Sequence, residues 1–407
     1  MATTHLAQAV DVRPMARPGS AEADALIQRA RELQPWLREQ AVLHRRERRI
    51  LPETIARLNE AGLFRVIQPR RYGGYEMSPE VFGQVLVLLA QADPSLGFAY
   101  GVIAVHSYHM GFYDERAAQE VWGEDDGVLI GSPYAPSGVA RRVEGGYRLS
   151  GRWSFSSGCE NCQWHFLGGM VEGEGEDGTV LERLKAFLVP RADARIVDNW
   201  HVVGLQGSGS KDIVVEDAFV PDYRVETFPI ADWSAHPGTA INPGGLFRVP
   251  FLPLFTRAVS SAALGALEGM IDYFSGYTAE RLNVLSQRVA RDPVVQAALG
   301  QARATADMLR TVFERDLAEM CRIGEQGIRI DPERFNLFLL QSANVPHLAQ
   351  AAALDLVRAA GANGIRQDHA LGTFHSDILV IGQHSSNTPR TWATNLGQML
   401  LGLAPQA

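Results

Sequence analysis

The chain has 407 residues, 46% hydrophobic and 21% charged, with a formal net charge of −8. This composition predicts a soluble globular protein of two or three domains, and the acidic balance gives no electrostatic basis for binding nucleic acid. No run of about 18 apolar residues and no signal-peptide pattern is present, so we expect no membrane association.

Three cysteines in so long a chain predict a reducing, cytoplasmic location. Cys159 and Cys162 form one Cys-x-x-Cys, but a zinc site would need a second pair or histidines at ligand spacing, and Cys321 is far away. We therefore expect two ordinary cysteines near a strand end and no metal site.

The first part of the chain follows a helical pattern. Residues 1–20 are polar and are expected to form a loose tail. Helical spacing of apolar residues then predicts helices over 21–48, 52–61, 79–92 and 94–109. Asp93 suits the N-cap of the last of these helices, and Pro94 suits its first position. The pattern predicts an N-terminal helical domain over residues 1–126.

Near residue 127 the pattern changes to short runs of strand type. They lie at 128–130, 140–143, 147–155, 164–171, 184–189 and 213–215. Gly145 and Gly146 mark a turn, and the acidic, glycine-rich stretch 172–183 is expected to be a solvated hairpin loop. Regular short strands with such turns predict a central antiparallel β-barrel over residues 127–238.

After a Pro- and Gly-rich connection the chain becomes helical again. Helices are expected over 256–282, 292–323, 331–361 and 388–403. Pro346 should kink the third of them, and Gly361 should end it. Four long amphipathic helices predict a C-terminal four-helix bundle over residues 239–407, and the whole chain is assigned to the α+β class.

Residues 146–158 (GYRLSGRWSFSSG) alternate like a strand and stop in small hydroxyl and glycine residues. Hydroxyls and free N–H groups at a strand end suit the polar edge of a planar cofactor. This stretch resembles the flavin-contacting strand of the acyl-CoA dehydrogenase superfamily. Further segments carry the resemblance in the family's order: 51–53 with 60–66, 69–74, 200–210, 212–221 and 361–364. It covers residues 22 to 403 and implies helical, β-barrel and four-helix-bundle domains in that order.

Two departures decide between branches of the superfamily. A dehydrogenase of this family needs a carboxylate base in the bundle, whereas residues 382–388 (GQHSSNT) contain His384 and no acid. The dehydrogenase strand usually reads Trp-Ile-Thr-Asn, whereas this chain reads WSFSSG at 153–158. Both features resemble the two-component (group D) flavin-dependent monooxygenases, a branch that includes the oxygenase component of hydroxyphenylacetate hydroxylase.

The resemblance implies an oxygenase that takes reduced flavin (FADH2 or FMNH2) from a separate flavin reductase. O2 would form a C4a-hydroperoxyflavin that hydroxylates a phenolic, indolic or polycyclic aromatic molecule. The sequence has no Gly-x-Gly-x-x-Gly motif opening a helix, which fits a protein that does not reduce its own flavin. An acyl-CoA dehydrogenase or oxidase and a non-catalytic flavin-binding scaffold are the alternatives. The family implies a homo-oligomer, usually a tetramer.

Four residues match the reactive positions of that branch. Ser157 would contact flavin N5, and otherwise it is a serine capping a turn. His106 would hold or deprotonate the substrate hydroxyl, with His109 as its rival and a packed core histidine as the alternative. Ser132 would bond the substrate oxygen, or is a plain loop serine. His384 would face the flavin, in the place of the missing carboxylate.

Other residues are expected to bind the flavin. Trp153, Phe155 and Ser156 would line the ring edge, and Trp200 would cover the ring. Ser386 and Asn387, which follow His384, would touch the flavin. Arg281 resembles the family arginine that reaches a cofactor phosphate, often across a subunit interface, unless it is simply an exposed arginine. Gly361 and Asn363 lie in the glycine turn that the family places near a neighbouring subunit's cofactor.

Overall fold

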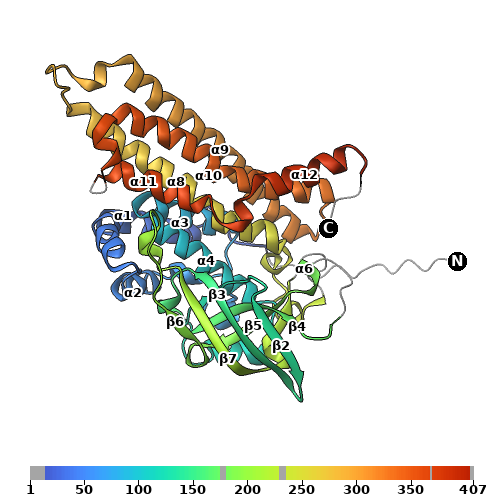
Figure 1. The fold of residues 1–407 in the computed structure, drawn as a ribbon. Coiled ribbons are helices and arrows are strands. Elements are labelled where there is room, and N and C mark those ends of the chain that lie inside the picture. The colour runs from blue at the N-terminus through green and yellow to red at the C-terminus, as the bar shows by residue number, and fades with distance from the viewer. Residues whose placement is uncertain (1–13, 175–179, 229–234, 367–368, 404–407) are drawn as a thin grey trace.

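The computed structural model describes residues 14–174, 180–228, 235–366 and 369–403 (Figure 1). N-terminal helices of up to 27 residues, a β-sheet and C-terminal helices of up to 34 residues follow one another along the chain. In Figure 1 the long helices run side by side across one end of the molecule, the sheet lies at the other end, and α3 and α4 lie between them. The domain boundaries expected at 126 and 238 stay predictions.

The N-terminal helices confirm the sequence pattern. They are α1 (Ala21–Glu47), α2 (Pro52–Glu60), α3 (Pro79–Ala92), α4 (Pro94–Met110) and α5 (Glu115–Trp122), of which only α5 was not expected. Asp93 caps α4, because its Oδ1 accepts a hydrogen bond from the Ser95 N–H at 3.0 Å. Every residue of α4 is buried, since the helix packs against α3, α8 and strand β1. A helix buried on all sides can present polar side chains only to internal sites.

The central part is an eight-stranded mixed sheet. Its strands are β1 (Ile130–Gly131), β2 (Gly138–Val143), β3 (Gly146–Ser156), β4 (Trp164–Val171), β5 (Lys185–Pro190), β6 (Arg195–Val197), β7 (Lys211–Pro221) and β8 (Val225–Thr227). The order is β6-β7-β3-β2-β4-β5-β8, and β1 pairs with β4. The expectation of a purely antiparallel sheet is wrong, because β1 and β2 both pair with β4 in parallel. Among the described strands, β6 and β8 end the order without pairing to each other, so the sheet is not closed there.

The two sides of the sheet pack into different hydrophobic cores. On β4, Phe166 packs into the large core shared with the helices, whereas Leu167 packs into a second core within the sheet. Trp153 of β3 lies in this second core. The turn that follows β3 meets α4: a Cβ built on Gly158, whose φ is 68°, would lie 2.7 Å from Ile103. The end of β3 is therefore held against the buried helix.

The C-terminal helices form the second half of the fold. They are α8 (Phe251–Glu280), α9 (Pro293–Gln326), α10 (Pro332–Ala360), α11 (Ala370–Ile381) and α12 (Pro389–Leu400), and α7 (Pro237–Ile241) precedes them. Helices α9, α10 and α11 each pack against α8, whereas α12 packs against α10 and contains no buried residue. The expected fourth helix at 388–403 is thus peripheral, and the unexpected α11 lies against α8 and α10. α10 continues through Pro346 and ends at Gly361 as expected.

Two further expectations concern the surface. The loop expected at 172–183 is described except for 175–179, and it includes the short helix α6 (Val180–Arg183). The loose tail expected at 1–20 lies largely outside the described residues. Within the described part of the chain, no helix has the length and hydropathy needed to cross a bilayer.

Candidate active site

The end of β3 has an unusual backbone that exposes one aromatic ring. The pairing of β3 with β7 is interrupted between Trp153 and Ser156, and Phe155 within this bulge has a φ of 70°. Its side chain is 71% exposed and its ring lies edge-on to Trp200, with 6.2 Å between centroids. A strained, exposed aromatic residue beside a buried tryptophan is costly in a purely structural turn and is typical of a binding site.

Ser157 lies at the end of a chain of three hydroxyl groups. Its Oγ is 2.8 Å from Ser210 Oγ, which is 2.8 Å from Ser208 Oγ. Ser208 Oγ in turn donates to the Leu205 carbonyl at 2.8 Å. Because the carbonyl accepts the proton of Ser208, Ser210 must donate to Ser208 and Ser157 to Ser210, so the chain has one direction and Ser157 Oγ keeps its lone pairs for an incoming donor.

The other aromatic and hydroxyl groups near this turn differ in accessibility. Trp153 is fully buried and donates from Nε1 to the Gly168 carbonyl at 2.7 Å, so we leave its side chain out of the proposed site. Trp200 is 7% exposed and donates from Nε1 to the Leu205 carbonyl at 3.0 Å. Ser156 Oγ is buried without a hydrogen-bond partner among the described residues. A buried orphan hydroxyl is costly unless a ligand or water satisfies it.

His384 lies in the turn between α11 and α12. Its Nδ1 accepts a hydrogen bond from the Ser386 N–H at 3.2 Å and lies 2.7 Å from Ser386 Oγ. Because an N–H can only donate, Nδ1 is unprotonated and the ring carries its proton on Nε2. Its ring lies 6.3 Å from Phe98 of α4 and 6.3 Å from Phe255 of α8, and burial lowers its pKa to about 4. At neutral pH it is a neutral hydrogen-bond donor.

Asn387 holds this turn in place. Its Nδ2 donates to the Ile381 carbonyl at 2.8 Å, and its own carbonyl lies 2.9 Å from His347 Nε2. Its Oδ1 is buried and has no partner in the described part of the chain.

His106, on α4, has the opposite tautomer. Its Nδ1 lies 2.8 Å from the Ile130 carbonyl. Since a carbonyl only accepts, Nδ1 carries the proton and Nε2 bears a free lone pair. Burial lowers the pKa of His106 to about 4, and Nε2 is buried with no partner among the described residues. The side chain is therefore a neutral acceptor for an incoming hydroxyl or N–H group.

A cluster of aromatic rings surrounds the two α4 histidines. His109 Nδ1 lies 2.6 Å from the Tyr134 hydroxyl, and burial holds the pKa of His109 well below its ordinary value. The Tyr134 ring lies 5.4 Å from His106 and 5.6 Å from Phe255, which in turn lies near His384. His109 also contacts the rings of Phe112, Tyr113, Phe166, Phe228 and Phe251. These contacts join His106 to His384 through one continuous apolar region. Ser132 is buried directly after β1.

The remaining expected cofactor residues form a second cluster. Arg281 donates to the Ala360 carbonyl at 2.7 Å and lies over the Tyr277 ring at 5.3 Å. Asn363 Nδ2 donates to Tyr277 Oη at 3.1 Å, and Gly361 has a φ of 69°. This cluster lies at the start of α11, whereas His384 follows its end, a helix length of about 18 Å away. One chain does not bring the two clusters together.

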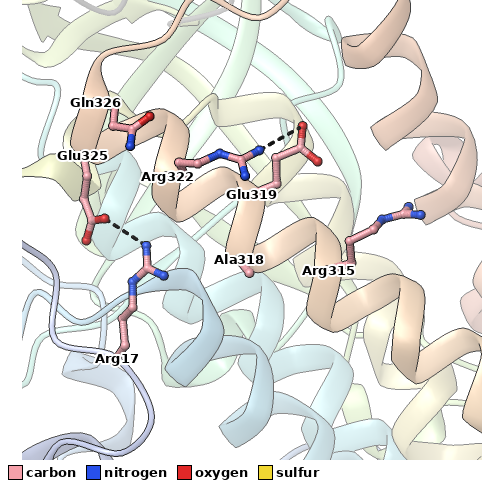
Figure 2. Close-up of a pocket in the computed structure, with 7 residues that line it drawn as sticks. All are labelled: Arg17, Arg315, Ala318, Glu319, Arg322, Glu325 and Gln326. Atoms are coloured by element: carbon pink, nitrogen blue, oxygen red, sulfur yellow. Dashed lines mark hydrogen bonds and ion pairs between the residues drawn. The ribbon is translucent and has the colours of Figure 1, made fainter.

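A separate surface pocket of about 530 Å³ lies along α9 (Figure 2). Figure 2 shows two ion pairs in it, between Arg17 and Glu325, which lie 2.9 Å apart, and between Arg322 and Glu319, which lie 4.0 Å apart. None of the expected site residues lines it, so it is not part of the candidate site.

The sequence did not identify three of the groups that organise the site. Tyr134, Ser210 and the buried Asp377, whose Oδ1 accepts the Leu205 N–H at 2.6 Å, were not selected as site residues. Ser208 and Ser210 were noticed only as part of a glycine-rich family segment. Their role depends on contacts between segments more than 50 residues apart, for which periodicity gives no signal.

Comparisons with known proteins agree with this geometry. Residues 258–389 match the family described as acyl-CoA dehydrogenase, C-terminal domain. The chain is 34% identical to a pigment production hydroxylase of Rhodococcus erythropolis over 88% of this chain and 91% of that protein. It is 31% identical to the oxygenase component of an FADH2-dependent resorcinol hydroxylase of Rhizobium sp., over 88% and 90% of the two chains.

The fold has a similar solved counterpart. The crystal structure of the 3-HSA hydroxylase from Rhodococcus sp. RHA1 superposes with a TM-score of 0.89 at 30% identity, covering 94% of this chain and 98% of that one. The chain therefore belongs to the family of flavin-dependent monooxygenase oxygenase components within the acyl-CoA dehydrogenase superfamily.

Proposed function

We propose that this chain hydroxylates an uncharged phenolic or indolic molecule, using O2 and reduced flavin, FADH2 or FMNH2, from a separate reductase. The observation that carries the proposal is the pair of neutral histidines with opposite tautomers, His106 with a free acceptor and His384 with a donor. The aromatic rings of Tyr134 and Phe255 link them. We therefore place a flat aromatic substrate along these rings, with its hydroxyl group on His106 and the flavin beside His384.

The residues present fit a flavin ring near Ser157. The exposed Phe155 ring and the hydroxyl chain ending at Ser157 offer an aromatic surface and a hydrogen-bond acceptor at one edge, and the Ser156 hydroxyl has no partner among the described residues. When bound, the reduced flavin supplies the reaction with O2. Ser157 would orient the ring edge, His384 would donate from Nε2, and the apolar region would exclude water.

The surroundings of His106 and His109 favour an uncharged substrate. Each ring that contacts these histidines belongs to a phenylalanine or a tyrosine. A nearby acid, Glu226, is already paired with His236, at 3.0 Å from its Nδ1. Burying a carboxylate without a cation costs roughly several kcal/mol, because the ion loses its hydration and gains no partner. A substrate with a phenol or indole N–H and no acid group is therefore the better match.

The second cluster supports an assembly of several chains. Arg281, Gly361 and Asn363 would meet the cofactor phosphates, yet they lie about a helix length from His384 in one chain. We propose that each flavin is bound between neighbouring protomers of a homo-oligomer, a tetramer by family expectation, in the cytoplasm. In this arrangement the protomers contact one another through the bundle that α8–α11 form.

The alternative of an acyl-CoA dehydrogenase has less support. It requires a carboxylate facing the flavin, and the turn at 382–388 contains none. The buried acid on α11, Asp377, is 2% exposed and is bound to a backbone N–H. A carboxyl group held in this way has no access to a thioester substrate.

The proposal is tested by substrate class. Reduced FMN or FAD, O2 and the purified chain are incubated with neutral phenols and indole, and with the matching arylacetates, and products are identified by mass. We expect hydroxylation of at least one neutral compound, with at least about tenfold lower yield from its carboxylate-bearing counterpart. Turnover of arylacetates alone, or bleaching of oxidised FAD by an acyl-CoA, would contradict it.

Replacing His106 with phenylalanine is expected to lower hydroxylation about 100-fold, because the acceptor for the substrate hydroxyl is lost. Flavin oxidation should continue and yield hydrogen peroxide, so the measurement is the ratio of hydroxylated product to peroxide. The exposed His201, changed to phenylalanine, is the control and should keep the wild-type ratio. An unchanged ratio in the His106 variant would remove His106 from the mechanism.

A further inference from the structure

The segment 204–210, which carries the hydroxyl chain, has a strained backbone. Leu205 has a φ of 53° and Gly209 a φ of 55°. A left-handed conformation is unfavourable for a residue with a side chain, so other contacts must hold Leu205 in it.

Those contacts converge on both backbone groups of Leu205. Its N–H donates to Asp377 Oδ1 at 2.6 Å. Its carbonyl accepts from Trp200 Nε1 at 3.0 Å and from Ser208 Oγ at 2.8 Å. The Asp377 carboxyl group therefore binds the N–H of Leu205, and the hydroxyl chain that reaches Ser157 binds the carbonyl of the same residue.

The segment has no free space on either side. A Cβ on Gly204 would lie 2.1 Å from the Ser376 carbonyl, so α11 approaches the backbone directly. On the other side, a Cβ on Gly207 would lie 2.8 Å from His44 and 3.1 Å from Ser95. His44 is itself fixed, since its Nδ1 lies 2.7 Å from Asp93 Oδ2. The segment is held between α11 and the ends of α1 and α4.

The chemistry of Asp377 fits a positioning role. The side chain is 2% exposed, and burial raises its pKa to about 7. Keeping an acid in a buried place costs free energy, which a leucine or alanine in the same place would avoid. In the described structure, the hydrogen bond from the Leu205 N–H offsets part of this free-energy cost.

We propose that Asp377 is a positioning residue that orients Ser157 toward the flavin through Leu205, Ser208 and Ser210. This rests on the proposed function only in assigning Ser157 to the flavin edge. Asp377 touches neither substrate nor cofactor; it fixes the carbonyl that accepts the Ser208 proton, and so the direction of the hydroxyl chain.

Three full-length variants separate positioning from simple stability. Asp377→Ala removes the acceptor, Asp377→Asn restores an acceptor of the same shape, and Ser210→Ala breaks only the hydroxyl chain. Asp292→Ala, which removes the N-cap of α9 far from this segment, is the control for a general loss of stability. Amide hydrogen exchange of residues 205–210 is measured without flavin, and reduced FMN or FAD affinity is measured under anaerobic conditions.

In Asp377→Ala we expect the Leu205 amide hydrogen to exchange at least tenfold faster than in the wild type. Flavin affinity should fall about fivefold, which corresponds to the loss of one hydrogen bond. Asp377→Asn should recover most of both losses. Ser210→Ala should show the weaker flavin binding with unchanged exchange at Leu205, and Asp292→Ala should show neither effect.

Two results would overturn the proposal. In one, Asp377→Ala loosens the segment but binds flavin like the wild type, which would make the residue only structural. In the other, Ser210→Ala binds flavin like the wild type. If the wild type binds flavin but hydroxylates no aromatic compound, the proposed function fails, while the exchange and affinity measurements still decide the role of Asp377.

Discussion

Changing Asp316 to alanine is expected to lower the thermal midpoint of the flavin-free protein by about 4–6 °C. Asp316 is fully buried on α9, where it pairs with Arg257 of α8, with Arg315 at 2.8 Å and with Arg334 of α10 at 3.1 Å. Arg257 is 2% exposed, and its Nε and Nη1 already lack partners among the described residues.

The magnitude follows from leaving a charge buried and unpaired. Breaking a buried pair from one side costs about 3–5 kcal/mol, because the remaining ion keeps its desolvation penalty. For a chain of 407 residues the unfolding entropy of about 2 cal/mol/K per residue converts this loss into the stated shift.

A paired replacement provides the control. Asp316→Leu combined with Arg257→Met removes both ions and fills similar volume, so it should recover at least half of the loss. If Asp316→Ala does not fold, Asp316→Asn keeps the shape and should still lower the midpoint. A midpoint within 1 °C of wild type for every single variant would show that these helices do not depend on the pair.

Lowering the pH from 7 to 5 is expected to reduce the free energy of unfolding by about 4 kcal/mol. Burial lowers the pKa of His106 and of His384 to about 4 and that of His165 to about 3, and it holds the pKa of His109 well below its ordinary value. Unfolded histidines titrate near 6.5, so between these limits the unfolded state binds more protons and stability falls as the pH falls. His106, His165 and His384 each contribute about 2 kcal/mol over this range, and His109 acts in the same direction.

One acid acts in the opposite direction. Burial raises the pKa of Asp377 to about 7, so the folded state binds more protons there, and stability rises by about 2 kcal/mol as pH falls from 7 to 5. His106, His165 and His384 together outweigh it by about 4 kcal/mol, which is the net loss stated above.

His165 is the group with which to test this. Both of its ring nitrogens are buried without partners in the described structure. His165→Leu should therefore be more stable than wild type at pH 5 and flatten the dependence of the midpoint on pH, whereas the exposed His201→Leu should leave the curve unchanged. A curve of unchanged slope for His165→Leu would contradict the assignment of the acid sensitivity to buried imidazoles.

Local sequence signals predicted the helices well where caps were explicit. Asp93-Pro94, Asp292-Pro293 and Asp331-Pro332 each mark a helix start that the structure confirms. α11 was missed because its β-branched residues and Gly372 have low helix propensity, and its conformation is stabilised by packing on α8 and α10. The parallel pairings of β4 were missed because alternation along a strand does not specify its neighbours.

For the site, residue type and family pattern led to His106, His384 and Ser157. Ring contacts through Tyr134 and Phe255 link the two histidines, whereas Ser157 is joined to Ser210, and the roles of all three stay predictions. The same reasoning chose Trp153, whose side chain the structure buries in the sheet core. Strand alternation could have shown this, since Trp153 shares its face with Leu149 of the same core. Tyr134 and Asp377 gave no sequence signal, because their importance comes from neighbours distant in the chain.

The fixed protons of His106 and His384 have a consequence for how the protein responds to its surroundings. Neither imidazole gains or loses charge over the range in which cells vary their acidity, since each titrates near pH 4. Any change in turnover between neutral and mildly alkaline conditions would then report the ionisation of the bound phenol or of the flavin. The two histidines proposed for the site therefore keep their hydrogen-bonding roles, His106 as acceptor and His384 as donor, through small shifts of pH around neutrality.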